Sequence, residues 1–194
     1  HFDTEHYNLM CSPLDLIQAL PKIVWHADNL LADQAMLPLY LVSKLAREHV
    51  TVCLSGDGGD ELFLGYPTYI ADTYLQYYKK IPYFIRRLFI TRIINSLPAS
   101  SKKLSFEYKT KKFIEGAEFP ADKAHYWWRT IFNDNEKKSL FSDAVINEIG
   151  SLDSYSSYLS HYNNCPEENE HLFNKFLYAD IKVWLADNNL IRVD

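Results

Sequence analysis

The chain has 194 residues, and 25 acidic against 20 basic side chains give it a net charge of −5. This balance provides no basic surface for nucleic acid, and no apolar run approaches the roughly 18 residues that span a membrane. The length is enough for one domain with a buried core. No signal-peptide pattern is present in the first residues, so we predict a cytoplasmic protein without nucleic-acid or membrane partners.

Three cysteines, Cys11, Cys53 and Cys165, lie far apart and have no metal-ligand spacing. Their odd number argues against a disulfide framework. Cys53 lies inside an apolar run, and we therefore expect it to be a buried core thiol.

The first 27 residues predict a strand followed by a helix. Residues 6–11 have the composition of a short strand, and Ser12 and Pro13 then provide an N-cap and a proline at the first helical position. Four apolar residues share one face of this helix, which we expect to be buried: Leu14, Ile17, Leu20 and Val24.

A second helix and a second strand follow. Residues 33–48 carry Leu37, Leu41 and Leu45 at intervals of four, which predicts another amphipathic helix. Residues 50–54 are apolar and rich in β-branched side chains, which predicts a strand. Helices and strands that alternate in this way indicate an α/β fold with a parallel sheet.

The most distinctive segment comes next and reads Ser55-Gly56-Asp57-Gly58-Gly59-Asp60-Glu61-Leu62-Phe63-Leu64-Gly65-Tyr66. It is a glycine-rich turn between a predicted strand and a predicted helix, where ligands bind in open α/β sheets. Glycine lets the backbone approach a ligand closely. Three carboxylates would repel a bare phosphate, but they suit a divalent cation such as Mg²⁺ held between acids and phosphate oxygens. The alternative is that these acids only complement the dipole and cap the first turn of a helix.

After residue 60 the chain is expected to be mostly helical. Residues 60–80 are rich in tyrosine, which more often packs than binds ligands. Residues 97–101 predict a turn, and the lysines between positions 102 and 112 suggest a solvated helix face. Residues 163–166 predict a loop before a last helix at about residues 168–185.

Residues 55–66 resemble the S-G-[DE]-G-x-D-E-L-F-x-G-Y signature of the asparagine synthetase family, in its glutamine-dependent, ATP-using synthetase domain. The resemblance extends to residues 7–25, 32–46 and 180–194, the last of which is similar to the family's D-x-x-x-x-L-x-D-x-x-L-x-K-x-D stretch. The clear similarity covers residues 1–75 and 175–194. It implies a parallel-sheet fold of the adenine-nucleotide α-hydrolase, PP-loop ATPase type.

The resemblance also implies a reaction. Enzymes of this family activate the side-chain carboxylate of aspartate with ATP, and ammonia then attacks the acyl-adenylate to give asparagine. The implied adenylate-binding residues are Ser55, Gly56, Gly58 and Gly59. Asp57 is implied near the acyl carbon or the ammonia, as the catalytic residue. Asp60 and Glu61 are implied as ligands of Mg²⁺ on the pyrophosphate.

Six residues, at four places in the chain, depart from the family pattern and leave the acyl substrate open. Leu64 stands where the family has Gly or Ala, Asn29-Leu30 replaces Glu-Pro, Gln34-Ala35 replaces small hydroxyl residues, and Arg192 replaces Lys. A relative acting on a sugar acid or a peptide is therefore an alternative. A domain of this family that has lost catalysis and serves as a binding module is another, although the intact acids of the signature argue against it.

The family's S-G-G-x-D-S pyrophosphate loop and a glutaminase nucleophile are not found in this sequence. We therefore expect residues 1–194 to be part of a synthetase domain that is inactive by itself. Apolar edges left uncovered in such a part favour self-association, and a homodimer or a larger species is expected at high concentration.

Overall fold

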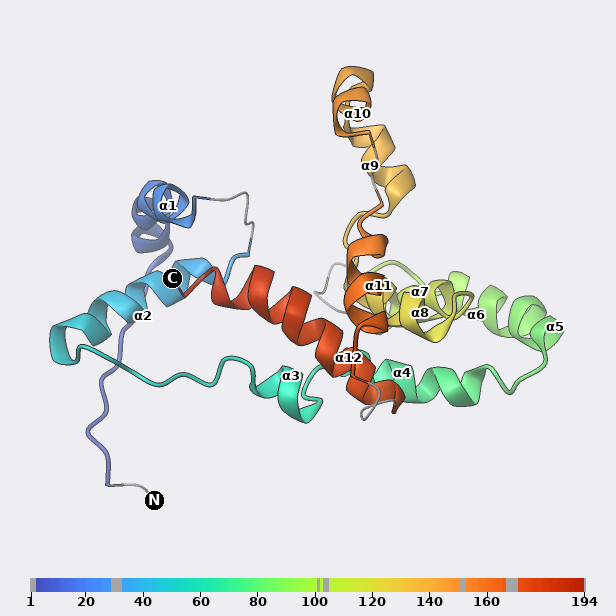
Figure 1. The fold of residues 1–194 in the computed structure, drawn as a ribbon, viewed down its shortest axis with the longest axis horizontal. Coiled ribbons are helices and arrows are strands. Elements are labelled where there is room, and N and C mark those ends of the chain that lie inside the picture. Colours follow the sequence, from blue (N-terminus) through green and yellow to red (C-terminus); the bar gives the residue numbers. More distant parts are fainter. Residues whose placement is uncertain are drawn as a thin grey trace. The chain divides into compact units, whose positions relative to one another are not determined.

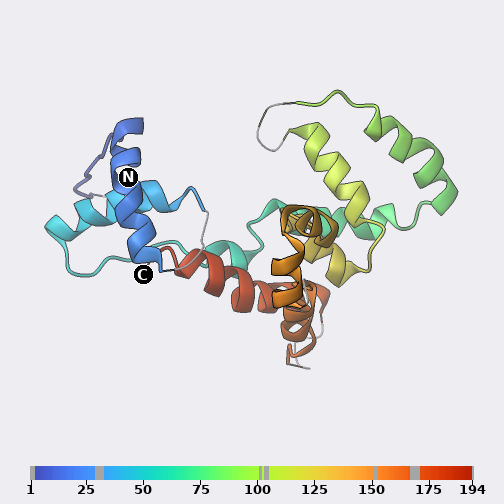
Figure 2. The same ribbon diagram turned by 90° about the horizontal axis from the view of Figure 1, so that it is seen from above.

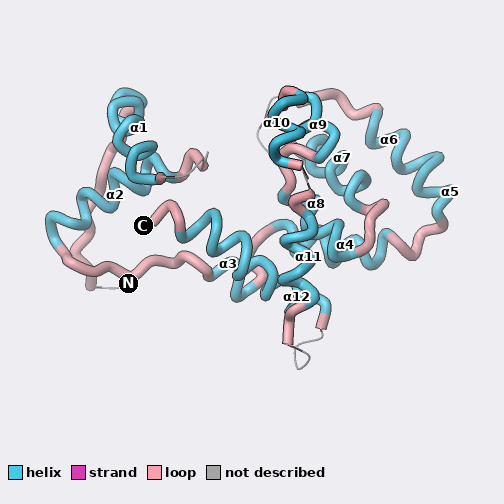
Figure 3. The backbone as a smooth tube through the Cα atoms, turned by 45° about the horizontal axis from the view of Figure 1, so that its top comes forward, coloured by secondary structure: helices cyan, strands magenta, loops and turns pink. Residues whose placement is uncertain are grey.

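The computed structural model describes residues 3–28, 33–100, 102, 105–150, 153–166 and 171–193. These residues are mostly helical, and no β-strand is present among them (Figure 3). They divide into two compact units, of which the first comprises residues 1–59 with 181–194 and the second residues 60–180. The prediction of a mostly helical chain after residue 60 is confirmed. No helix in the described ranges has the length and apolar character needed to cross a bilayer.

The two predicted strands, residues 6–11 and 50–54, are irregular segments instead. Leu54 is 99% exposed and Cys53 is also exposed, so the prediction of a buried thiol is wrong. A strand forms when a neighbouring strand satisfies its backbone N–H and C=O groups. The described part of the chain offers these segments no such neighbour, so the parallel sheet is not shown.

The first unit is built around helices α1 (Pro13–Ala27) and α2 (Met36–His49), which pack on each other (Figure 1). The predicted start of α1 is confirmed. The Ser12 hydroxyl accepts from the Asp15 N–H at 3.2 Å, and the Asp15 carboxylate accepts from the Ser12 N–H at 2.8 Å. This reciprocal capping box satisfies two N–H groups that a helix start would otherwise leave unpaired.

The core of the first unit lies on a different side of α1 from the one predicted. Ala19 and Ile23 are buried against Met36, whereas the four predicted face residues are exposed: Leu14, Ile17, Leu20 and Val24. Apolar spacing identifies possible faces, but the neighbouring helix decides which of them is covered. On α2 the predicted face is confirmed in part, since Leu37 and Leu41 pack against this core.

The first unit ends in a π-helical segment, η3 (Ile181–Leu190), which continues directly from the last helix of the second unit. The predicted last helix therefore exists among the described residues, and it runs from Leu172 to Leu190. The predicted start near residue 168 lies outside the described residues, as do residues 29 and 30.

The second unit is an assembly of short helices. Its elements are α3 (Gly59–Phe63), α4 (Pro67–Tyr78), α5 (Tyr83–Ile85), the π-helical η1 (Arg86–Ile90), α6 (Thr91–Asn95), α7 (Phe106–Gly116), α8 (Ala121–Arg129), α9 (Asp134–Leu140), α10 (Asp143–Ile149), α11 (Tyr155–Asn163) and α12 (Leu172–Asp180). Residues 60–80 are thus two helices, not one, because Leu64 has a left-handed backbone and Pro67 starts a new helix.

Helix α8 is central to this unit, because α4, α7 and α11 all pack against it, while α12 packs on α11 and α6 on α7 (Figure 2). Leu75, Ala117 and Ala124 are buried where α4, α7 and α8 meet. Around them, the Phe113 and Trp128 rings stack with centroids 5.6 Å apart. Of the tyrosines after residue 60, Tyr69 is buried as expected for packing, but others such as Tyr74 and Tyr77 are exposed.

Candidate functional site

The first part of the signature, residues 55–59, forms a tight turn in the first unit. The Ser55 hydroxyl donates to the Asp57 carboxylate at 2.7 Å, and the Gly59 N–H donates to the Gly56 carbonyl at 3.1 Å. Ser55 and Asp57 are both exposed. These bonds hold the Asp57 carboxylate close to its own turn while leaving it open to a ligand.

Gly58 lies at the middle of this turn and has a φ of +88°. Residues with a Cβ rarely adopt this left-handed conformation. A Cβ here would also lie 3.4 Å from the Leu185 side chain of η3. The turn therefore requires glycine at this position. It packs against the C-terminal segment, which is part of the family-like stretch at residues 180–194.

Arg192 joins three segments of the first unit that are distant in sequence. Its guanidinium donates to the Asp33 carboxylate at 2.7 Å and to the Asn189 side-chain oxygen at 2.9 Å. It also lies 4.0 Å from the Asp57 carboxylate. A guanidinium can reach several acceptors from one fixed plane, whereas an ammonium is a point charge. The departure from the family lysine at this position therefore changes how the carboxylates beside the signature are paired.

The second part of the signature starts the second unit, and its two acids have opposite surroundings. Asp60 is exposed, whereas Glu61 is fully buried and accepts a hydrogen bond from the Tyr66 hydroxyl at 2.8 Å. Asp60 therefore offers a hard oxygen donor of the kind that Mg²⁺ prefers. No cluster of three or more possible metal-ligating side chains is found in the described ranges.

The turn after α3 is tight and includes Leu64, one of the residues that depart from the family pattern. Leu64 has a φ of +60°, which costs a residue with a Cβ about 1–2 kcal/mol. At Gly65, a Cβ would approach the Asp60 carboxylate oxygen to 2.0 Å. Gly65 therefore allows the Asp60 side chain to lie over the turn.

A buried cluster of charged side chains lies in the second unit, and sequence reasoning missed it. His125 is fully buried, with Nδ1 2.5 Å from the Asp72 carboxylate and Nε2 3.0 Å from the Asp180 carboxylate. The same Asp180 oxygen accepts from the Tyr69 hydroxyl at 2.5 Å and from the Arg129 guanidinium at 2.7 Å. Helices α4, α8 and α12 are thereby joined by hydrogen bonds.

The pKa of the His125 imidazole shows which interactions prevail. Burial by itself lowers this pKa, but the hydrogen bonds and charges of Asp180 and Asp72 outweigh burial and raise it above the ordinary value. Burial also raises the pKa of Tyr69, with the charge of Asp180 adding to the effect. The one signal available in the sequence was Asp180, the first residue of the matched C-terminal stretch.

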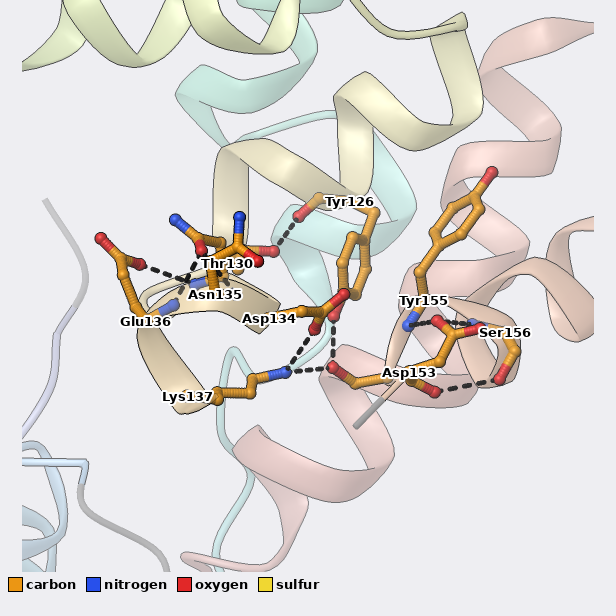
Figure 4. Close-up of polar contacts among 11 residues, drawn as sticks. Tyr126, Thr130, Asp134, Asn135, Glu136, Lys137, Asp153, Tyr155 and Ser156 are labelled. Atoms are coloured by element: carbon orange, nitrogen blue, oxygen red, sulfur yellow. Dashed lines mark hydrogen bonds and ion pairs between the residues drawn. The ribbon is translucent and has the colours of Figure 1, made fainter. Parts of the chain in front are cut away.

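A cavity of about 330 Å³ also lies in the second unit, beside α8 and the starts of α9 and α11, and Figure 4 draws polar contacts among residues around it. Most of the polar groups around it bond to one another. The Tyr126 hydroxyl donates to Ser154 at 2.8 Å, the Lys137 ammonium lies 2.6 Å from the same Ser154 oxygen, and Asp153 accepts from the Tyr155 N–H at 3.1 Å. Most polar groups at the rim of the cavity therefore stabilise the starts of the surrounding helices.

Asn133 at this rim is an N-cap whose loss can be measured. Its side-chain oxygen accepts from the N–H groups of Asn135 and Glu136, both at 3.0 Å, and Glu136 accepts in return from the Asn133 N–H at 2.7 Å. Asn133→Ala is expected to lower the free energy of unfolding by about 1 kcal/mol, as measured by urea denaturation. Asn135→Ala, an exposed neighbour, is the control. Equal losses in the two variants would show that the cap contributes nothing.

The comparisons with known proteins agree with one another. The family model described as asparagine synthase matches residues 1–194. Asparagine synthetase [glutamine-hydrolyzing] 1 of Bacillus subtilis is 31% identical over 98% of this chain. A putative asparagine synthetase [glutamine-hydrolyzing] of Mycobacterium tuberculosis is 36% identical over 57% of it, and one of Methanocaldococcus jannaschii is 38% identical over 44%. No solved structure matches.

These relatives are considerably longer than this chain. The chain spans 28% of the length of the Bacillus subtilis protein and 17% of the length of the other two. Since the family model nevertheless covers all 194 residues, and the signature turn has the exposed acids and left-handed glycine described above, the chain belongs to the asparagine synthase family.

Proposed function

We propose that this chain is part of an ATP-dependent, amide-forming enzyme that converts aspartate to asparagine. ATP activates the aspartate side-chain carboxylate as an acyl-adenylate, and ammonia released from glutamine attacks it. The observation that carries the proposal is the signature turn of a family member, in which Ser55, Asp57 and Asp60 are all exposed. A side chain kept for helix capping alone would be bonded to the first-turn N–H groups, whereas the Asp57 carboxylate accepts from the Ser55 hydroxyl.

Each signature residue has a proposed role. Ser55, Gly56, Gly58 and Gly59 bind the adenylate, for which the left-handed Gly58 brings backbone groups close to the ligand. Asp57 is proposed to take up a proton from the attacking ammonia, because a carboxylate within hydrogen-bond reach can act as a general base. The Arg192 guanidinium lies 4.0 Å from the Asp57 carboxylate and places a positive charge beside it.

Asp60 and Glu61 are the residues proposed for Mg²⁺. The donor set fits at Asp60, which offers an exposed carboxylate, while Glu61 is committed to Tyr66 inside the second unit. We therefore propose that Asp60 is the direct ligand of Mg²⁺ and that Glu61 stabilises the helix that carries Asp60. When bound, Mg²⁺ supplies charge neutralisation for the departing pyrophosphate.

Pyrophosphate release tests the proposal. The protein expressed from its complete gene is incubated with Mg-ATP, aspartate and ammonia, and the Asp60→Ala variant is assayed beside it. We expect aspartate-dependent release that falls by about 100-fold or more in the variant, since a lost charge-stabilising group typically costs this much. Asp143→Ala, which removes an exposed acid from α10, is the control and should leave the rate unchanged.

Two other results would redirect the proposal. Release with a sugar acid or a peptide, but not with aspartate, would retain the chemistry and change the acyl substrate. The departure at Arg192, which pairs with Asp33 in the first unit, is the observation behind this alternative. No pyrophosphate release with any of the carboxylates tested would indicate a binding module that has lost catalysis.

A further inference from the structure

The environment of His125 specifies its protonation state. Both ring nitrogens face carboxylate oxygens, Asp72 at 2.5 Å and Asp180 at 3.0 Å. A neutral imidazole carries one N–H, so its other nitrogen would direct a lone pair at a carboxylate. Turning the ring over exchanges the two nitrogens without removing this conflict. Only the doubly protonated ring donates to both partners.

The charges of the buried cluster lead to the same assignment. Asp72 and Asp180 contribute two negative charges, and the Arg129 guanidinium, bonded to Asp180, contributes one positive charge. The exposed fraction is 2% for each of the two aspartate side chains and 11% for Arg129. Because unbalanced buried charge is costly, a second cation is favoured here. An imidazolium at His125 brings the sum over Asp72, Asp180, Arg129 and His125 to zero.

The other groups around the ring leave this count unchanged. From α4 Tyr69 faces it, from α11 Tyr158, and from α12 the Phe176 ring, which stacks on the imidazole with centroids 4.3 Å apart. Burial raises the pKa of both tyrosines, so they remain neutral. The pKa of His125 is itself raised, because the hydrogen bonds and charges of the two aspartates outweigh the effect of burial.

The cluster continues to the signature through Arg129. The Arg129 guanidinium lies over the Tyr66 ring, 4.6 Å from its centroid, and the Tyr66 hydroxyl donates to Glu61 at 2.8 Å. Glu61 is a residue of α3, the helix that carries Asp60. Arg129 thus contacts both the Asp180 carboxylate and the Tyr66 ring, and Tyr66 is bonded to α3, the signature helix.

We propose that His125 is a buried imidazolium that positions the signature helix, by holding Asp180 and through it Arg129 against the Tyr66–Glu61 pair. The inference concerns the second unit alone and does not depend on the proposed reaction. His125 acts only through other residues, so it is a positioning residue and not a catalytic one.

The protonation state is tested by NMR of the chain labelled with ¹⁵N in histidine. We expect both ring nitrogens of His125 to carry protons at pH 7.4, about one pH unit above the ordinary histidine pKa. His161 on α11, half-buried and outside the cluster, is the internal control. A singly protonated His125 ring, with its proton transferred to Asp72 or Asp180, would overturn the proposal.

The positioning role is tested by amide hydrogen exchange in His125→Asn and the matched control His161→Asn. The peptide covering residues 60–66 is the readout, because it contains the Gly65 N–H that donates to the Asp60 carbonyl. We expect exchange there to be about 10-fold faster in His125→Asn, with the α7 amides unchanged. Faster exchange everywhere would mean a merely structural role, and an unchanged peptide would mean no link to the signature; either result would overturn the proposal.

If His125→Asn does not fold, the unaltered chain provides the same test. The pKa of His125 is raised in the folded state. His125 therefore keeps its proton at any pH below the ordinary histidine pKa, and it loses the proton only as the pH rises through the pKa of the folded state. After correction for the intrinsic pH dependence of exchange, protection of residues 60–66 should fall with the same midpoint as the NMR titration. Different midpoints would separate His125 from the signature and contradict the proposal.

Discussion

Asp180→Asn is expected to lower the free energy of unfolding by about 3–5 kcal/mol, the range for breaking a buried ion pair from one side. One Asp180 oxygen accepts from Tyr69 at 2.5 Å, from Arg129 at 2.7 Å and lies 3.0 Å from His125. The amide that replaces the carboxylate removes the charge that these buried cations require. Urea denaturation followed by tryptophan fluorescence measures the loss, since the Trp128 indole donates to Asp72 of the same cluster.

The control is Asp187→Asn, an exposed aspartate seven positions further along the same helical segment. It should change the free energy of unfolding by less than about 0.5 kcal/mol. The double variant Asp180→Asn/His125→Gln tests the mechanism, because it removes one negative and one positive charge together. We expect it to lose about 0.5–3 kcal/mol less than the sum of its single variants. Strict additivity would show that the two groups do not interact.

Gly116→Ala is expected to destabilise the second unit by about 1–3 kcal/mol, as overpacking of a core does. A Cβ at this position would lie 2.2 Å from one ring atom of Trp128 and 2.9 Å from one of Trp127. Trp128 has little freedom to move away, because its ring stacks on Phe113 and its indole N–H donates to Asp72 at 2.8 Å. The added methyl group therefore disturbs the core and the charged cluster together.

Thermal unfolding and near-ultraviolet circular dichroism check this prediction. The melting temperature should fall, and the aromatic signal of the native state should change because the Trp128 ring must shift. Gly56→Ala is the matched control, since no atom lies within 4 Å of a Cβ built there. If Gly116→Ala had the same melting temperature as Gly56→Ala, the two indole rings would be able to move aside at little cost, contrary to the packing described.

Local chemistry allowed several features to be predicted from the sequence. Ser12 and Pro13 marked the start of α1, because a cap and an N-terminal proline act within one turn. The signature and its flanking matches identified the family. Each of these depends on residues that are neighbours in the chain.

Other features depend on partners that the sequence does not name. The segment at residues 50–54 has strand composition, but a strand requires a neighbour to bond with, and the described residues provide none. The apolar stripe of Leu14 and Ile17 was visible, yet α2 covers Ala19 and Ile23 instead. The sequence pattern indicates which segments and helix faces could be paired or buried, and the tertiary packing determines which of them are.

The charged cluster shows the same division most clearly. Asp72, His125 and Asp180 are separated by more than fifty residues at each step, and each was one polar residue in an aromatic-rich segment. The sequence by itself determined the family, the start of α1 and the acids of the signature, because these follow from adjacent residues. Only the tertiary structure decided that Glu61 is buried while Asp60 is exposed, and that two aspartates enclose one histidine, because burial and charge pairing arise between helices.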